Sequence, residues 1–102
     1  MTAPDADPSA SATPPLSRTV TIVNRRGLHA RAAARFVKTA ERFKAEITVV
    51  RKDTVVSGLS IMGLMMLAAA PGATLELRAS GAEAEAALDA LSKLVADKFD
   101  ED

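Results

Sequence analysis

The sequence has no cysteine, no tryptophan and no tyrosine, and it has one histidine among its 102 residues. Without cysteine, neither a disulfide framework nor a thiolate metal site can form, which is compatible with the cytoplasmic location that we expect. No apolar run approaches the roughly 20 residues of a transmembrane helix, so we expect no membrane segment. Hydrophobic residues make up 48% and charged residues 25%. This balance and length are typical of one globular domain.

Proline is concentrated at the start of the sequence. Four of the five prolines lie in residues 1–15, among small polar residues that cannot bury enough apolar surface to offset the entropy of ordering. We therefore expect residues 1–16 to form a disordered tail. This segment lacks the basic start and apolar centre of a secretory signal. Residues 17–102 are expected to form the domain.

Hydrophobic periodicity in that domain predicts the order β-α-β-β-α-β-α. The expected strands are residues 18–23, 46–50, 54–57 and 74–79. The expected helices are about residues 30–42, 61–70 and 84–95. The second and third strands are close enough in the sequence to form a hairpin. Because each strand has one apolar face, we expect an α+β open-faced β-sandwich, a four-stranded antiparallel sheet with three helices on one face.

The single imidazole, His29, lies between the first expected strand and the first expected helix. Gly27 allows a positive φ or a close backbone approach just before it. The first amides of a helix have no intrahelical partner and carry partial positive charge, so an anion on the imidazole would meet them. Arg31 adds a guanidinium suited to phosphate oxygens. Since neutral imidazole is a nucleophile, we predict that His29 accepts a phosphoryl group beside Arg31.

The distribution of charge favours an anionic ligand or an acidic partner near His29. The net charge is zero, but residues 16–40 carry six basic residues and no acid, whereas residues 82–102 carry seven acids. Arg25, Arg26 and Arg35 belong to the basic segment and raise its positive potential. We predict that these three arginines contact a partner. The residues alone leave open that the arginines are merely solvated and that the histidine only caps a helix.

Several catalytic features are missing from the sequence. It has no G-x-x-x-x-G-K-[ST] loop, no acidic cluster near His29 to hold Mg²⁺ and no second histidine. We therefore expect no metal, no cofactor and no stand-alone catalysis. Separate enzymes would have to load and unload the phosphoryl group.

The stretch G-L-H-A-R-A-A at residues 27–33 resembles the active-site signature of the histidine-containing phosphocarrier family, HPr, of the bacterial phosphoenolpyruvate-dependent phosphotransferase system. The resemblance covers about residues 18–99 and implies an HPr-like phosphocarrier domain. It implies that His29 takes a phosphoryl group on Nδ1 from enzyme I and passes it to an enzyme IIA component, with Arg31 as the adjacent arginine. The proline that usually follows this arginine is Ala32 here, so the first helical turn loses a preset φ.

A second stretch, G-L-S-I-M-G-L-M-M-L at residues 58–67, is similar to a serine-led helix of the same family, in the form common to alphaproteobacterial members. Ser60 corresponds to a serine modified by HPr kinase/phosphorylase, which is a further implied partner. The sequence leaves open whether Ser60 is only a helix cap or a regulated one. We expect Ile61, Met62 and Met65 to be partly exposed beside His29 as a docking patch.

Two branches of the family and one other class remain as alternatives. The ending FDED and the N-x-x-G-L-H opening are similar to the nitrogen-related regulatory branch, NPr, which we favour over sugar uptake. A chain of another class would be a small regulatory domain that binds an anionic metabolite or RNA without phosphoryl transfer. Three phenylalanines and no other aromatic residue leave little for base stacking, so no nucleic-acid partner is expected.

Overall fold

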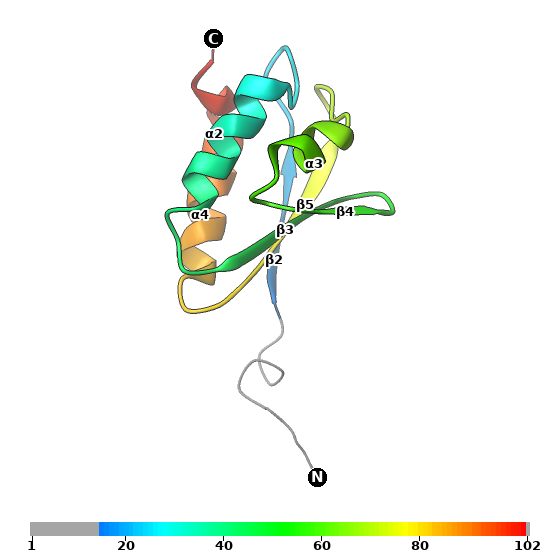
Figure 1. The fold of residues 1–102 in the computed structure, drawn as a ribbon. Helices are drawn as coiled ribbons and strands as arrows, with labels where there is room; N and C mark the ends of the chain where they lie inside the picture. Colours follow the sequence, from blue (N-terminus) through cyan, green and yellow to red (C-terminus); the bar gives the residue numbers. More distant parts are fainter. Residues whose placement is uncertain (1–14, 102) are drawn as a thin grey trace.

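The computed structural model describes residues 15–101 and confirms the expected α+β fold. In chain order the elements are β2 (Leu16–Thr21), α2 (Ala30–Ala40), β3 (Glu46–Arg51), β4 (Thr54–Ser57), α3 (Ile61–Met66), β5 (Thr74–Ser80), α4 (Ala84–Ala96) and the 3₁₀ turn η1 (Lys98–Asp100). The strands form one antiparallel sheet in the order β2-β5-β3-β4. The three helices lie on the same side of this sheet (Figure 1).

Alternation along the strands explains why one face of the sheet is buried. In the central strand β5, Leu75 and Leu77 are buried at 2% and 0% exposure, whereas Arg78, between Leu77 and the buried Ala79, is exposed. The helices contribute their own apolar stripes, including Phe36 of α2 and Leu88 of α4. Burial of each of these large side chains contributes roughly 1.5–3 kcal/mol. The core between sheet and helices therefore holds the start of α2 in a fixed place.

The first strand begins earlier than the periodicity predicts. Leu16 already pairs with Ala79 of β5, so it belongs to the sheet and not to the expected tail of residues 1–16. In the rest of that expected tail, residues 1–14 lie outside the described residues, and Pro15 is exposed and precedes the strand. The strand ends at Thr21, although Ile22 still exchanges backbone hydrogen bonds with Gly72 and Ala73. The boundary differs because pairing with a long β5, and not side-chain alternation, sets where β2 begins.

The expected hairpin at residues 46–57 is confirmed. β3 and β4 are joined by Lys52 and Asp53, and Arg51 pairs with Thr54 at its end. Lys52 takes a left-handed conformation with φ 54°, which a tight two-residue connection requires.

Two helices end earlier than predicted. α2 stops at Ala40, and α3 stops at Met66 where we expected a helix up to residue 70. The chain leaves the helical path at Ala68, whose φ is 51°. Ala69 is then buried, and its carbonyl accepts a hydrogen bond from Leu28 N–H at 2.9 Å. The apolar run after α3 is therefore used to support the loop that carries His29.

Candidate functional site

His29 is the N-cap residue of α2. Its backbone is extended, with φ −78° and ψ −179°. Its Nδ1 accepts a hydrogen bond from Arg31 N–H at 3.3 Å, and its carbonyl accepts from Ala33 N–H at 2.8 Å. The imidazole therefore stands at the free amides of a helix start, as the sequence predicted. Nδ1 is the ring nitrogen that faces those amides.

The loop before His29 depends on a glycine. Gly27 has φ +69°, and a Cβ placed on it would lie 2.5 Å from the carbonyl oxygen of Ala69. Both roles expected at Gly27, a positive φ and a close backbone approach, are therefore confirmed. The hydrogen bond from Leu28 N–H to the carbonyl of Ala69 holds these two backbone segments close together.

Gly27→Ala is expected to destabilise the fold more than Gly72→Ala does. Both glycines have positive φ, but a Cβ on Gly72 would meet nothing within 4 Å. The left-handed backbone costs an alanine about 1–2 kcal/mol at either position, and only position 27 adds a clash with Ala69. Urea unfolding of both variants measures the difference. Equal losses would contradict the close approach at Gly27.

The other ring nitrogen of His29 is held by a carboxylate from the far end of the domain. Nε2 hydrogen-bonds with Oε2 of Glu101. The second oxygen of Glu101 accepts from Asn24 Nδ2 at 3.1 Å. Asn24 is fully buried and its Nδ2 also donates to the carbonyl of Gly27 at 2.7 Å. The side chains of His29 and Glu101 are only 16% and 17% exposed, so the ring is covered on its Nε2 side.

Glu101 is a stable anion in this setting. Burial favours the neutral carboxyl and works to raise its pKa. The hydrogen bonds from Asn24 and His29, with the positive charge of Arg26, outweigh burial and hold the pKa of Glu101 below its ordinary value of 4.5. The carboxylate is therefore ionised at neutral pH.

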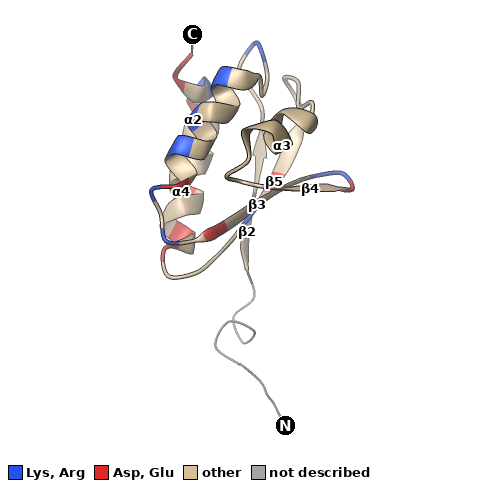
Figure 2. Ribbon diagram, in the orientation of Figure 1, with Lys and Arg blue, Asp and Glu red and all other residues tan. Residues whose placement is uncertain are grey.

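The structure brings the predicted arginines together around one hollow. Arg25, Arg26, Arg31 and Arg35 line it, together with Asp100 and Glu101. Figure 2 shows the basic positions of α2 and its preceding loop on the side where the acidic end of the chain also lies. A neighbouring hollow is lined by His29, with Arg26, Leu28 and residues 68–70. Since Arg26 borders both, the histidine and the arginine cluster form one continuous surface.

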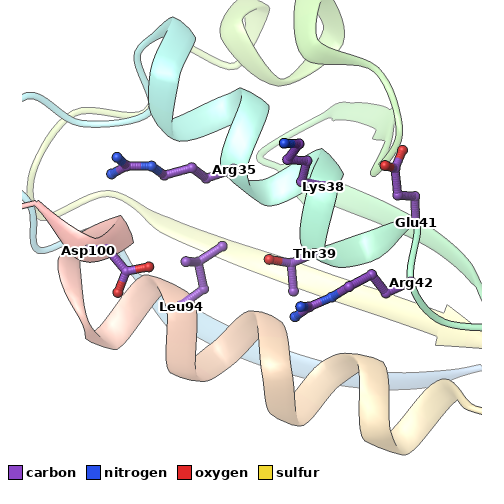
Figure 3. A pocket seen from close by; sticks show the side chains of 7 residues that line it. All are labelled: Arg35, Lys38, Thr39, Glu41, Arg42, Leu94 and Asp100. Atoms are coloured by element: carbon purple, nitrogen blue, oxygen red, sulfur yellow. The ribbon is translucent and has the colours of Figure 1, made fainter.

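A second basic hollow lies further along α2, opposite α4 and η1. It is lined by Arg35, Lys38, Thr39, Glu41, Arg42, Leu94 and Asp100. In Figure 3, Leu94 and Asp100 come from the side of α4 and η1, and Thr39 faces them from α2. This hollow does not contain His29. It shares Arg35 and Asp100 with the first hollow, so it extends the basic surface along α2 away from the imidazole.

The expected cap and the expected exposed side chains at α3 are both confirmed. Ser60 is the N-cap residue, and its Oγ accepts from Gly63 N–H at 2.9 Å. Ile61, Met62 and Met65 are 40%, 75% and 44% exposed. A Cβ on Gly63 would lie 3.0 Å from Ser60 Oγ, so the glycine allows close packing at the cap. The chain runs from α3 directly into residues 68–70, which line the hollow with His29.

Sequence reasoning missed two members of the site, Asn24 and Glu101. Glu101 is 72 positions away from His29, and no spacing rule links the two. The signals available were the FDED ending and the N-x-x-G-L-H opening, which contain Glu101 and Asn24 but do not show that the two meet at His29. Asn24 stands in a loop, where buried and exposed asparagines look alike in sequence.

Within residues 15–101 no group of three or more histidine, cysteine, aspartate or glutamate side chains could hold a metal ion. None of the helices described above has the length and apolar character needed to cross a bilayer.

Comparisons with known proteins point to one family. Residues 16–97 match the family model described as the PTS HPr component phosphorylation site. The phosphocarrier protein HPr of Neisseria meningitidis serogroup A is 48% identical over 86 residues, which cover 84% of this chain and 97% of that protein. The phosphocarrier protein NPr of Shewanella violacea is 49% identical over 86 residues, covering 84% and 94%. The crystal structure of HPr-C-His from Thermoanaerobacter tengcongensis superimposes with a TM-score of 0.81 at 41% identity, covering 85% and 98%.

Proposed function

This chain belongs to the HPr family of the phosphoenolpyruvate-dependent phosphotransferase system, and on that premise we propose that His29 carries the phosphoryl group in a nitrogen-type regulatory branch. As a member of the family, the chain relays a phosphoryl group between enzyme I and an enzyme IIA and is not itself a catalyst. The observation that supports His29 most directly is the position of its Nδ1, which faces the free amides of α2 while Nε2 is occupied by Glu101.

The transfer step follows from this arrangement. The lone pair of Nδ1 attacks phosphorus, and the bond between phosphorus and the donor group breaks. The negative charge on the phosphoryl oxygens then lies at the start of α2, where the amides and the Arg31 guanidinium stabilise it. In the reverse sense, an acceptor attacks phosphorus and the electron pair of the N–P bond returns to Nδ1.

The proposed partner surface surrounds this atom. Arg25, Arg26 and Arg35 would meet acidic groups of enzyme I and enzyme IIA, since charge complementarity steers such encounters. The exposed apolar side chains of α3, at Ile61, Met62 and Met65, would supply an adaptable apolar contact that several partners can use in turn. These partners work in the cytoplasm, where we place the chain as well.

The regulatory branch is supported by the similarity to the NPr of Shewanella violacea, at 49% identity, and by the sequence features named above. Similar identity to proteins named HPr makes sugar uptake the second candidate. The deciding experiment incubates the chain with enzyme I and ³²P-phosphoenolpyruvate, then adds a nitrogen-type or a sugar-type enzyme IIA. We expect faster loss of label to the nitrogen-type acceptor. Preferential transfer to the sugar-type acceptor would overturn the branch, and a chain that is never labelled would favour an anion-binding regulatory domain.

Ser60 is proposed as a regulatory site for HPr kinase/phosphorylase, because its hydroxyl lies beside the apolar contact surface. A phosphate there adds about −1.5 to −2 charge. Ser60→Asp keeps an oxygen able to cap α3 but adds a charge, so transfer from enzyme I should slow by at least about tenfold, the equivalent of 1.4 kcal/mol of repulsion. Ser60→Ala should transfer normally while losing about 1 kcal/mol of stability. Normal transfer by the aspartate variant would count against regulation at this site.

A further inference from the structure

Asn24, Glu101 and His29 form a chain of hydrogen bonds that ends on the ring nitrogen not used for transfer. We propose that Glu101 is a positioning residue for His29: it holds the ring proton on Nε2, keeps the lone pair of Nδ1 directed at the start of α2, and balances the positive charge that the ring gains on phosphorylation. This inference rests on the proposed function and adds a residue to it.

The two contacts of the ring indicate the same tautomer independently. Nδ1 accepts a hydrogen bond from Arg31 N–H, so Nδ1 carries no proton. Nε2 faces a carboxylate oxygen of Glu101, which as an anion can only accept. A neutral imidazole has one N–H group, and here that group belongs to Nε2. The nucleophilic lone pair therefore lies on Nδ1 before any partner arrives.

Asn24 fixes the carboxylate of Glu101 in turn. Both hydrogens of its amide are committed, one to Glu101 and one to the carbonyl of Gly27. Its Oδ1 is buried and has no hydrogen-bond partner among the residues that the structure describes. The reverse orientation of the amide would place that oxygen against two other oxygens. The amide of Asn24 can be buried because both of its hydrogens find acceptors, in Glu101 and in the carbonyl of Gly27.

The segment that presents Glu101 is anchored separately. Phe99 is fully buried, and its carbonyl accepts a hydrogen bond from the guanidinium of Arg35. Lys98, Phe99 and Asp100 all have positive φ, of 60°, 55° and 62°, a conformation that disfavours residues other than glycine. Burial of the Phe99 ring and the hydrogen bond from Arg35 offset this strain, so an ordered turn places Glu101 beside His29.

The chemistry of transfer gives the carboxylate its effect. When the Nδ1 lone pair forms the bond to phosphorus, the proton stays on Nε2 and the ring becomes a cation. The Glu101 carboxylate, hydrogen-bonded to Nε2, stabilises that cation. The other charged groups around it are Arg26, Arg31, Arg35 and Asp100. When the phosphoryl group leaves, its bonding pair returns to Nδ1 and the ring is neutral again. No proton has to leave the site in either direction.

The first test measures where the ring proton is. In the full chain, ¹⁵N shifts of the His29 ring should show the proton on Nε2 in the wild type. Glu101→Ala should give a mixture of tautomers, whereas Glu101→Gln should keep the Nε2 proton because its amide oxygen still accepts. Glu85→Gln is the matched control, since Glu85 is an exposed glutamate on α4. Unchanged ring shifts in Glu101→Ala would overturn the proposal.

The second test measures transfer from enzyme I. Loss of a group that orients an imidazole costs about 10–100-fold where this has been measured at ligated histidines, and we expect a loss of that size in kcat for Glu101→Ala with little change in KM. Glu101→Gln should be intermediate, because it keeps the hydrogen bond but removes the charge. A wild-type rate in Glu101→Ala would also overturn the proposal. If the wild-type chain itself takes no label, the proposed function fails, and the ring shifts still decide the role of Glu101.

Discussion

Replacing His29 by alanine is expected to abolish phosphoenolpyruvate-dependent labelling completely. The loss should be total, because His29 is the single histidine of the sequence and no second imidazole can accept the phosphoryl group in its place. Labelling with enzyme I and ³²P-phosphoenolpyruvate measures this directly, with the label tested for its lability in acid. A His29→Ala chain that takes up acid-labile phosphate at the normal rate would show that another group is the acceptor.

The matched control for this experiment is His29→Asn. Alanine removes the N-cap of α2 as well as the nucleophile, which costs about 1 kcal/mol. Asparagine is among the preferred N-cap residues and can accept the hydrogen bond that Arg31 N–H now donates to Nδ1. We therefore expect His29→Asn to recover stability without recovering any label. The pair separates the chemical role of the imidazole from its structural role at the helix start.

Phe99→Ala is expected to cause the largest loss of stability among the changes considered, about 3–5 kcal/mol. The ring is fully buried in the core, and its removal leaves a cavity. This loss is a large fraction of the 5–15 kcal/mol that stabilises a typical domain. Urea unfolding measures the free energy, and the ring nitrogens of His29 should show the same tautomer mixture as in Glu101→Ala, because the turn that carries Glu101 loses its anchor.

The comparison variant for Phe99 is Met66→Ala. Met66 is also a large apolar side chain, but it is 75% exposed, so its truncation should change stability by no more than about 0.5 kcal/mol. A Phe99→Ala chain as stable as Met66→Ala would mean that the turn at η1 is not packed against the core in solution.

The hydrophobic patterns of short sequence segments predicted most of the fold. The strands at β3, β4 and β5 and the helices α2 and α4 were predicted to within two residues, because side-chain alternation and helical periodicity report directly which face is buried. The larger errors are at α3, which ends four residues earlier than expected, and at β2, which is displaced by two residues at both ends. After α3 the chain turns at Ala68 and Ala69 accepts a hydrogen bond from Leu28 N–H, and Leu16 joins the sheet because Ala79 lies opposite. Both boundaries are set by partners distant in the sequence, which periodicity does not report.

The site residues fall into the same two groups, those that neighbouring residues identify and those that a distant part of the chain brings into place. His29, Arg31 and Ser60 stand at helix starts, and a helix start can be recognised from neighbouring residues alone. The contact between His29 and Glu101 depends on how α4 and η1 return toward α2, and on the left-handed turn at residues 98–100. That turn contains no glycine to mark it. Its path became apparent only in three dimensions.

The capping role of His29 has a consequence for the carrier once it is charged. Bond formation at Nδ1 consumes the lone pair that now accepts from Arg31 N–H, which by itself would leave the first turn of α2 frayed. The arriving group brings oxygens to the same place, and each of them can receive that hydrogen. Phosphorylation would therefore replace one capping group at the start of α2 by another. The phosphorylated and unphosphorylated proteins would then present nearly the same backbone to the next partner.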